Sequence, residues 1–186
     1  MMLGQFFNKK AQLKASYRKF IWMLMIAYGC FIGMICFMPQ PSIEGVTTPN
    51  VIYLGRLRLL LVPFNSFIYF NELDSLWEKF WVVGQNISNI FLLYPLGICI
   101  HLLWDRWSGL KKSLLLGLSM STFIEVTQLM LDLLFEFNRV FEIDDLWTNA
   151  LGVFLAYLTV KWLKNKQLLN KHNMNSYAII LKLKRL

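Results

Sequence analysis

Residues 137–152 read FNRVFEIDDLWTNALG, and they lead directly into an apolar run, residues 150–160, that is long enough to enter a membrane. Four ionisable side chains and an amide stand at the mouth of this segment: Arg139, Glu142, Asp144, Asp145 and Asn149. A carboxylate placed in hydrocarbon costs about 2 kcal/mol or more on insertion scales. An acidic cluster at this place therefore indicates water, a partner or a ligand, and it is the first candidate for function.

The composition is that of a membrane protein. Of the 186 residues, 56% are hydrophobic and only 16% are charged, and the mean hydropathy is +0.47, values outside the usual range of soluble domains. A helix needs roughly 20 apolar residues to cross a bilayer. The sequence predicts an all-α integral membrane protein with about four transmembrane helices, at residues 20–38, 87–104, 113–134 and 146–163 of a membrane domain that covers 20–165.

The distribution of charge predicts the orientation. If the N-terminus is inside, fifteen of the nineteen Lys and Arg residues fall on the cytoplasmic side and nearly all acids fall outside. By the positive-inside rule both chain ends are then cytoplasmic, with basic segments at 1–19 and 166–186. This asymmetry accounts for the net charge of +8 without nucleic-acid binding. Residues 1–19 fit a short helix on the anionic leaflet or a disordered basic tail.

An external segment, residues 39–85, is expected between the first two spans. Its apolar part, residues 51–64, has about a dozen residues and is interrupted by two arginines, so it is predicted to be interfacial or re-entrant. Residues 74–83 then show helical spacing of aromatic and aliphatic side chains behind a possible N-cap at Asp74. Such aromatic residues favour the headgroup level of a membrane.

Each of the last three spans has one face of polar or small residues at helical spacing. On the second span these are Asn86, Asn89, Leu93, Gly97, His101 and Asp105; on the third, Gly117, Ser121, Glu125, Gln128 and Asp132; on the fourth, Asp145, Asn149, Gly152 and Ala156. Small residues let helices approach closely, and polar residues avoid lipid. The three faces are therefore expected to meet in a polar pocket that opens outward and narrows to a tightly packed inner half.

Glu125 is predicted to lie about 14 Å inside the outer end of its helix, at 1.5 Å per residue. Either burial keeps it protonated, or it pairs with Arg139 beside Gln128; a buried ion pair that only fixes helix register is the structural alternative.

Other polar or breaking residues of the spans have structural interpretations. Pro95 should free the carbonyl of Phe91, which a kink or a neighbouring side chain must satisfy. His101 is expected to snorkel or to cap its helix. The three cysteines fall inside spans and suit packing. No metal site and no cofactor are predicted.

Four pieces of the sequence resemble the VanZ-like family of small bacterial membrane proteins. They are Val62-Pro63-Phe64, the stretch from Asn89 through Pro95 to Gly97, Glu125-Val-Thr-Gln128, and the stretch from Arg139 to Gly152. Together they cover roughly residues 60–160 in the family's order. Glu142 stands where the family often has Asp. The resemblance implies a multi-pass protein of the bacterial cytoplasmic membrane, of a type linked to teicoplanin-class glycopeptide resistance in Gram-positive bacteria.

The leading functional hypothesis is a pocket at the outer face that binds a membrane lipid, a lipid-linked envelope precursor or a lipoglycopeptide. Its candidate residues are Asn89, Glu125, Gln128, Arg139, Glu142, Asp144, Asp145 and Asn149, with Pro63, Phe64, Pro95, Gly97 and Gly152 in structural roles. One alternative is an intramembrane enzyme on a lipid-linked substrate, with Glu125 as general acid or base; no catalytic set is assigned. The other is a structural partner of a second membrane protein.

Overall fold

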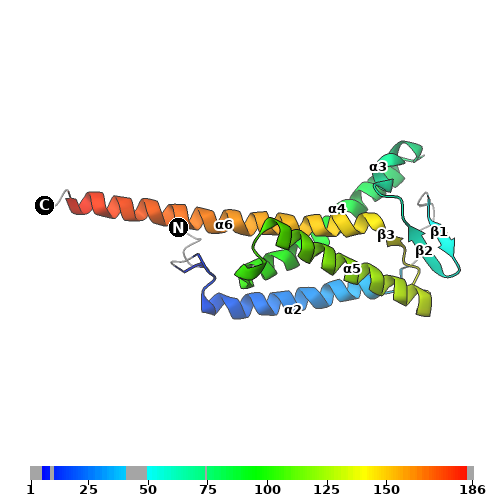
Figure 1. The fold of residues 1–186 in the computed structure, drawn as a ribbon, viewed down its shortest axis with the longest axis horizontal. Coiled ribbons are helices and arrows are strands. Elements are labelled where there is room, and N and C mark those ends of the chain that lie inside the picture. The colour runs from blue at the N-terminus through cyan, green and yellow to red at the C-terminus, as the bar shows by residue number, and fades with distance from the viewer. Residues whose placement is uncertain (1–5, 9–10, 41–49, 74, 184–186) are drawn as a thin grey trace.

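Four long helices make up most of the protein. The computed structural model describes residues 6–8, 11–40, 50–73 and 75–183. The helices are α2 (Ala15–Phe37), α4 (Leu76–Leu103), α5 (Leu110–Phe135) and α6 (Ile143–Leu183). They lie side by side, and the C-terminal part of α6 projects beyond the other three (Figure 1).

Three of these helices, α2, α4 and α5, are long and apolar enough to cross a membrane. They contain the first three predicted spans to within one residue at their ends. The fourth predicted span, residues 146–163, lies within α6, which is not among the three. A four-span topology therefore stays a prediction.

Helix α4 begins at Leu76, eleven residues before the predicted span, because the aromatic segment before the span is continuous with it. Ser75 is the N-cap: its hydroxyl accepts from the Glu78 amide at 3.1 Å, and the Glu78 carboxylate accepts from the Ser75 amide at 3.2 Å. This reciprocal pair is a capping box. Asp74, the expected cap, lies outside the described residues.

A small sheet occupies part of the segment that was expected to be interfacial or re-entrant, so the all-α prediction misses three short strands. They are β1 (Ile52–Leu54), β2 (Leu57–Leu60) and β3 (Phe141–Glu142), in the order β1-β2-β3. β1 and β2 form an antiparallel hairpin, and β2 pairs with β3 in parallel. The alternation of Arg and Leu suits a strand, and Gly55, with φ of +63°, supplies the turn.

The remaining elements are single turns: α3 (Asn65–Ile68), η1 (Phe70–Glu72) and η2 (Asp105–Trp107). The sheet, α3 and the first turn of α6 gather at one end of the bundle, and η2 lies at the opposite end between α4 and α5 (Figure 1).

Helix α6 packs closely against both α4 and α5 through small residues. A Cβ atom added at Gly97 would lie 2.8 Å from the Ala156 Cβ, and one added at Gly117 would lie 2.7 Å from the Ala150 Cα. A Cβ at Gly152 would overlap the carbonyl oxygen of Ile90. The polar-or-small faces of the three helices are therefore in contact, with backbones closer than any side chain would allow.

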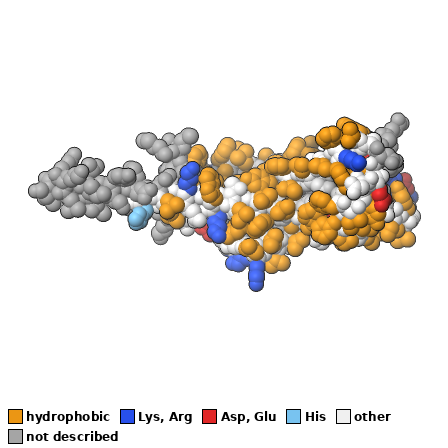
Figure 2. Space-filling model, turned by 90° about the horizontal axis from the view of Figure 1, so that it is seen from above, with side chains coloured by type: hydrophobic (Ala, Val, Ile, Leu, Met, Phe, Trp, Pro, Cys, Tyr) orange, Lys and Arg blue, Asp and Glu red, His pale blue; other side chains and the backbone are white. Residues whose placement is uncertain are grey.

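The outer surface of the bundle is apolar. Hydrophobic side chains cover most of the face in Figure 2, and Lys and Arg side chains gather mainly toward the end from which α6 projects. Helix α2 is the least buried of the spanning candidates, and it contributes only Ile32 and Cys36 to the buried core. An apolar exterior of this extent suits a lipid surrounding.

Tyr28 of α2 meets the carbonyl group that Pro95 frees in α4. Its hydroxyl donates to the Leu92 carbonyl at 3.0 Å and reaches the Phe91 carbonyl at 3.5 Å. A side chain of the neighbouring helix thus lies where the missing amide of Pro95 would have donated.

Gly152→Ala should lower the free energy of unfolding by about 1–3 kcal/mol, because the new methyl group meets backbone of α4 that cannot rotate away. Gly29→Ala is the matched control: a Cβ there meets nothing within 4 Å, and Ala is favoured over Gly in a helix by roughly 1 kcal/mol. Thermal or denaturant unfolding in detergent compares the two. Equal stability of the two variants would contradict the close packing of α6 on α4.

Candidate functional site

A cavity of about 1020 Å³ lies at the end of the bundle that carries the sheet. Its lining comes from α2, α4, α5 and the start of α6, together with all three strands and the loop before β3. Seven of the eight candidate residues line it: Asn89, Glu125, Gln128, Arg139, Glu142, Asp145 and Asn149. Polar side chains separated by up to 60 positions in the sequence therefore converge on one space.

Asp144, the eighth candidate, is not among the residues that line the cavity. It is 2% exposed, and its Oδ1 accepts from the Phe64 amide at 2.6 Å and from the Trp147 indole at 3.0 Å. Phe64 adopts the left-handed conformation, φ 57°, and its ring lies 5.5 Å from that of Trp147. Asp144 thus connects Phe64, which follows the β1–β2 hairpin, to the first turn of α6.

Glu125 joins α5 to β3. Its side chain is 1% exposed, and its Oε2 accepts from the Glu142 amide at 3.2 Å. Of the two alternatives for Glu125, the ion pair with Arg139 is not formed, and Gln128 does not serve as its hydrogen-bond neighbour. That alternative rested on the closeness of Arg139 to the helix of Glu125 in the sequence. In the structure the arginine instead donates to several acceptors at the C-terminus of α2.

Arg139 caps the last turn of α2. Its guanidinium donates to the Met38 carbonyl at 2.7 and 3.1 Å, to the Ile35 carbonyl and to the Gln40 side chain. The Gln128 amide donates to the neighbouring Cys36 carbonyl at 3.0 Å. The last four carbonyl groups of a helix have no partner within it. Two cavity residues therefore hold α2 in place as one wall of the cavity.

Glu142 contacts Gln85 of α4 in the cavity lining. The Gln85 amide donates to its Oε1 at 2.9 Å. Burial, reinforced by the nearby negative charge of Asp144 and opposed by the Gln85 hydrogen bond, raises the pKa of Glu142 to about 7. Its carboxyl group therefore exchanges a proton near neutral pH.

A hydrogen-bonded chain links α4, α5 and α6 at the cavity floor. The Asn89 amide donates to Asp145 Oδ1, and the Ser121 hydroxyl donates to the Asp145 carbonyl at 2.9 Å. The Asn149 amide donates to the Ser121 hydroxyl at 3.1 Å, while Asn149 Oδ1 is buried and unpaired. Buried polar networks of this kind fix the relative positions of helices.

The cavity lining also contains aromatic rings. These are Tyr28 and Phe31 of α2 and Trp77, Phe80, Trp81 and Phe91 of α4, and Arg58 of β2 contributes a second cation. The cavity thus combines carboxyl, amide and guanidinium groups with rings. Among the described residues, no group of three or more His, Cys, Asp or Glu side chains is arranged to hold a metal ion.

The sequence did not identify Gln85, Arg58 or the aromatic rings as residues of the cavity lining. Gln85 precedes Asn89 by four positions, so the helical spacing that singled out Asn89 could have found it. Asn86, which was placed on the polar face instead, donates to the Val82 carbonyl of its own helix at 2.9 Å. Arg58 could not be placed because its strand was not predicted.

His101 lies away from this cavity and neither snorkels nor caps a helix. It is fully buried, with its Nε2 3.1 Å from the Ser113 hydroxyl, which donates to the Val153 carbonyl. The expectation failed because α5 and α6 enclose the inner end of α4, so the ring meets protein before it can reach water.

A family model described as VanZ/LLP1 matches residues 20–164, which is most of the chain and includes all eight candidate residues. Neither the search of curated proteins nor the search of solved structures gave a match.

Glu142 should make stability depend on pH. Because its folded-state pKa, about 7, exceeds the ordinary value of 4.5, the native state binds the proton more tightly than the unfolded state. Its contribution is therefore fully present below about pH 4.5, falls as the pH rises, and levels off above about 7. Glu142→Gln keeps an acceptor for Gln85 without titrating, so the stability lost over this range should shrink by on the order of 3 kcal/mol.

The measurement is denaturant unfolding of detergent-solubilised wild type, Glu142→Gln and Glu136→Gln between about pH 5 and pH 8. Glu136 is a suitable control because its side chain is 63% exposed in a surface ion pair with Arg56. Identical pH profiles for wild type and Glu142→Gln would show that Glu142 does not titrate in this way.

Arg139→Gln should loosen the last turn of α2 and expose Cys36, which is only 3% exposed in the wild type. Hydrogen bonds to a charged donor contribute roughly 1.5–3 kcal/mol. The labelling rate of Cys36 with a thiol reagent, in a background with Cys30 and Cys99 replaced by Ala, is expected to rise several-fold. Arg56→Gln, which removes an exposed arginine, should leave the rate unchanged; an equal rise in both variants would refute the capping role.

Proposed function

The chain belongs to the VanZ/LLP1 family, and we propose that it is a bacterial cytoplasmic-membrane protein whose cavity opens to the outer face and binds an amphiphile of the cell envelope. The ligand is a membrane lipid, a lipid-linked precursor or a lipoglycopeptide antibiotic. Binding there contributes to resistance to teicoplanin-class glycopeptides.

The observation that carries this proposal is the mixed lining of the cavity. Glu125, Glu142 and Asp145 share it with aromatic rings of α2 and α4. Carboxyl and amide groups recognise a charged or hydroxylated headgroup, and aromatic side chains accept the adjoining apolar part. A ligand with both parts matches this cavity better than a purely polar or a purely apolar one.

The topology in this proposal has four spans, with α6 crossing the membrane through residues 146–163 and both ends of the chain in the cytoplasm. The small residues that join α6 to α4 and α5 support it, because they place that part of α6 among spanning helices. The excess of Lys and Arg at the end opposite the cavity supports the orientation.

An acyl chain reaches the membrane from this cavity along α2. Helix α2 contributes Tyr28, Phe31 and Ile35 to the lining, and Phe31 and Ile35 are 48% and 46% exposed. Exposed apolar side chains at the edge of a site suit the apolar part of a bound amphiphile.

Susceptibility to teicoplanin and vancomycin tests the proposal in a sensitive Gram-positive host that expresses wild type, Glu125→Gln or Asp145→Asn at matched membrane levels. Each substitution removes a charge but keeps an oxygen that can accept the hydrogen bond from the Glu142 amide or the Asn89 amide. Wild type is expected to protect, more against the acylated teicoplanin, and both variants are expected to protect less.

Glu136→Gln serves as the matched control, because it removes a carboxylate outside the cavity lining. It should protect as the wild type does. Equal protection by all four proteins would show that the cavity carboxyl groups play no part in resistance, and absence of protection by the wild type would refute the resistance role of this chain.

A further inference from the structure

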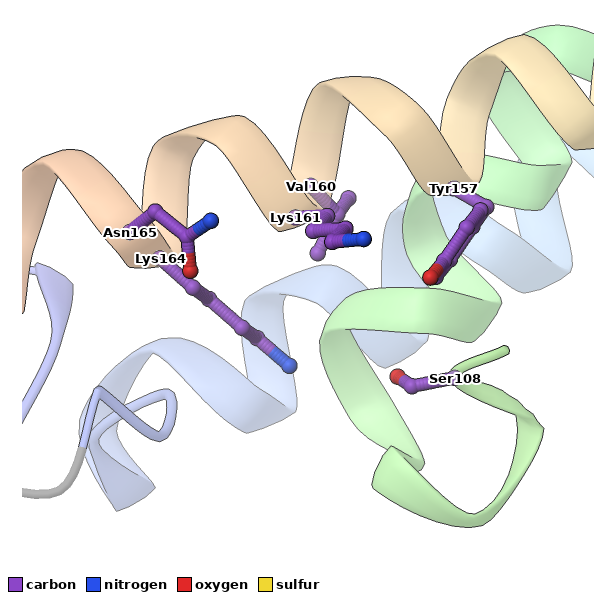
Figure 3. A pocket seen from close by; sticks show the side chains of 6 residues that line it. All are labelled: Ser108, Tyr157, Val160, Lys161, Lys164 and Asn165. Carbon is purple, nitrogen blue, oxygen red and sulfur yellow. The ribbon is translucent and has the colours of Figure 1, made fainter. Parts of the chain in front are cut away.

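A second, smaller cavity of about 170 Å³ lies at the opposite end of the bundle. Its lining residues are Ser108, Tyr157, Val160, Lys161, Lys164 and Asn165 (Figure 3). Ser108 comes from the connection between α4 and α5, and the other five come from α6. Tyr157 and Lys164 extend from α6 toward that connection (Figure 3).

This cavity lies at a membrane surface whichever way the protein is oriented. Helices α4 and α5 are both long and apolar enough to span, and the connection between them, residues 104–109, holds a 3-10 turn and three polar side chains. A polar connection between two consecutive spanning helices stays at the level of the lipid headgroups or in water. This position is independent of the proposed function of the larger cavity.

The chemistry of the lining suits an oxyanion. The Lys164 ammonium pairs with Asp105 at 2.6 Å and donates to the His101 carbonyl at 3.4 Å. Lys161 forms no ion pair within the described part of the chain, and its ammonium lies 5.7 Å from the centre of the Tyr157 ring. Asp105 balances Lys164, so Lys161 leaves the site with a net positive charge, beside the Ser108 hydroxyl and the Asn165 amide.

Apolar side chains adjoin the charged group on the same helix. Leu158 and Trp162 are 41% and 58% exposed, and they precede Asn165 by seven and three positions, which places all three along one face of α6. A phosphate bound at Lys161 would therefore have a hydrophobic surface beside it for an attached chain.

We propose that this cavity binds the phosphate group of an anionic phospholipid in the adjacent leaflet. Lysine residues near a membrane surface each contribute about 1 kcal/mol to attraction of anionic lipid, and Ser and Asn side chains donate hydrogen bonds to phosphate oxygens. The lipid anchors α6 at the level where it leaves the bundle.

The test uses full-length protein in a neutral detergent and three probes: short-chain phosphatidylglycerol, short-chain phosphatidylcholine and inorganic phosphate. The melting temperature of the wild type should rise with phosphatidylglycerol, and much less with either of the other two. Lys161→Gln should bind phosphatidylglycerol about fivefold more weakly, the equivalent of roughly 1 kcal/mol. Asn165→Leu, which removes a donor without changing charge, should also weaken binding.

Lys166→Gln is the matched control, because Lys166 lies on the same helix, outside the cavity lining, over the Trp162 ring. It should bind phosphatidylglycerol as the wild type does. If Lys161→Gln and Lys166→Gln weaken phosphatidylglycerol binding equally, the proposal is overturned, because the lipid is then attracted by the general positive charge at this end of the bundle. An equal rise with inorganic phosphate would overturn it in favour of a site for the free anion.

Discussion

The structure depends on satisfying backbone carbonyl groups that the helices cannot satisfy themselves. In apolar surroundings an unpaired carbonyl costs several kcal/mol, and in this bundle side chains of neighbouring segments supply the missing donors. Arg139 and Gln128 serve the end of α2, and the Tyr28 hydroxyl reaches the Phe91 carbonyl that Pro95 leaves in α4. Each of these bonds joins two different elements, so the helices are locked together by the groups that would otherwise destabilise them.

The same constraint divides the polar residues at the cavity into two kinds. Gln128 and Arg139 donate their hydrogen bonds to carbonyl groups of α2. Asp144, outside the cavity lining, accepts bonds at its Oδ1 from Phe64 and Trp147. Glu142 and Asp145 instead meet the amide side chains of Gln85 and Asn89. Side-chain pairs rearrange more readily than bonds to a helix backbone, so the second kind is better suited to exchange its partners for those of a ligand.

Sequence periodicity was sufficient to group five of the candidate residues that line the cavity, Asn89, Glu125, Gln128, Asp145 and Asn149, but not to assign their partners. The positions of Glu125, Gln128, Asp145 and Asn149 followed from helical spacing alone, because a helix fixes which side chains share a face. The partner of Arg139 did not follow, since it depends on where α2 ends relative to a loop 100 residues away. The hairpin does not follow from hydropathy, because two arginines in an apolar run read as interruptions of a membrane segment, whereas in the structure they alternate with leucines as a strand requires.

Helix α6 is continuous over 41 residues without a proline, which at 1.5 Å per residue is about 60 Å, roughly twice the thickness of a hydrocarbon core. Its first turn carries Asp145 at the larger cavity, and its other end stands clear of the bundle (Figure 1). If α6 crosses the membrane upright, only about half of its length can therefore lie in lipid, and the remainder stands beyond the hydrocarbon core as a rigid extension of the bundle.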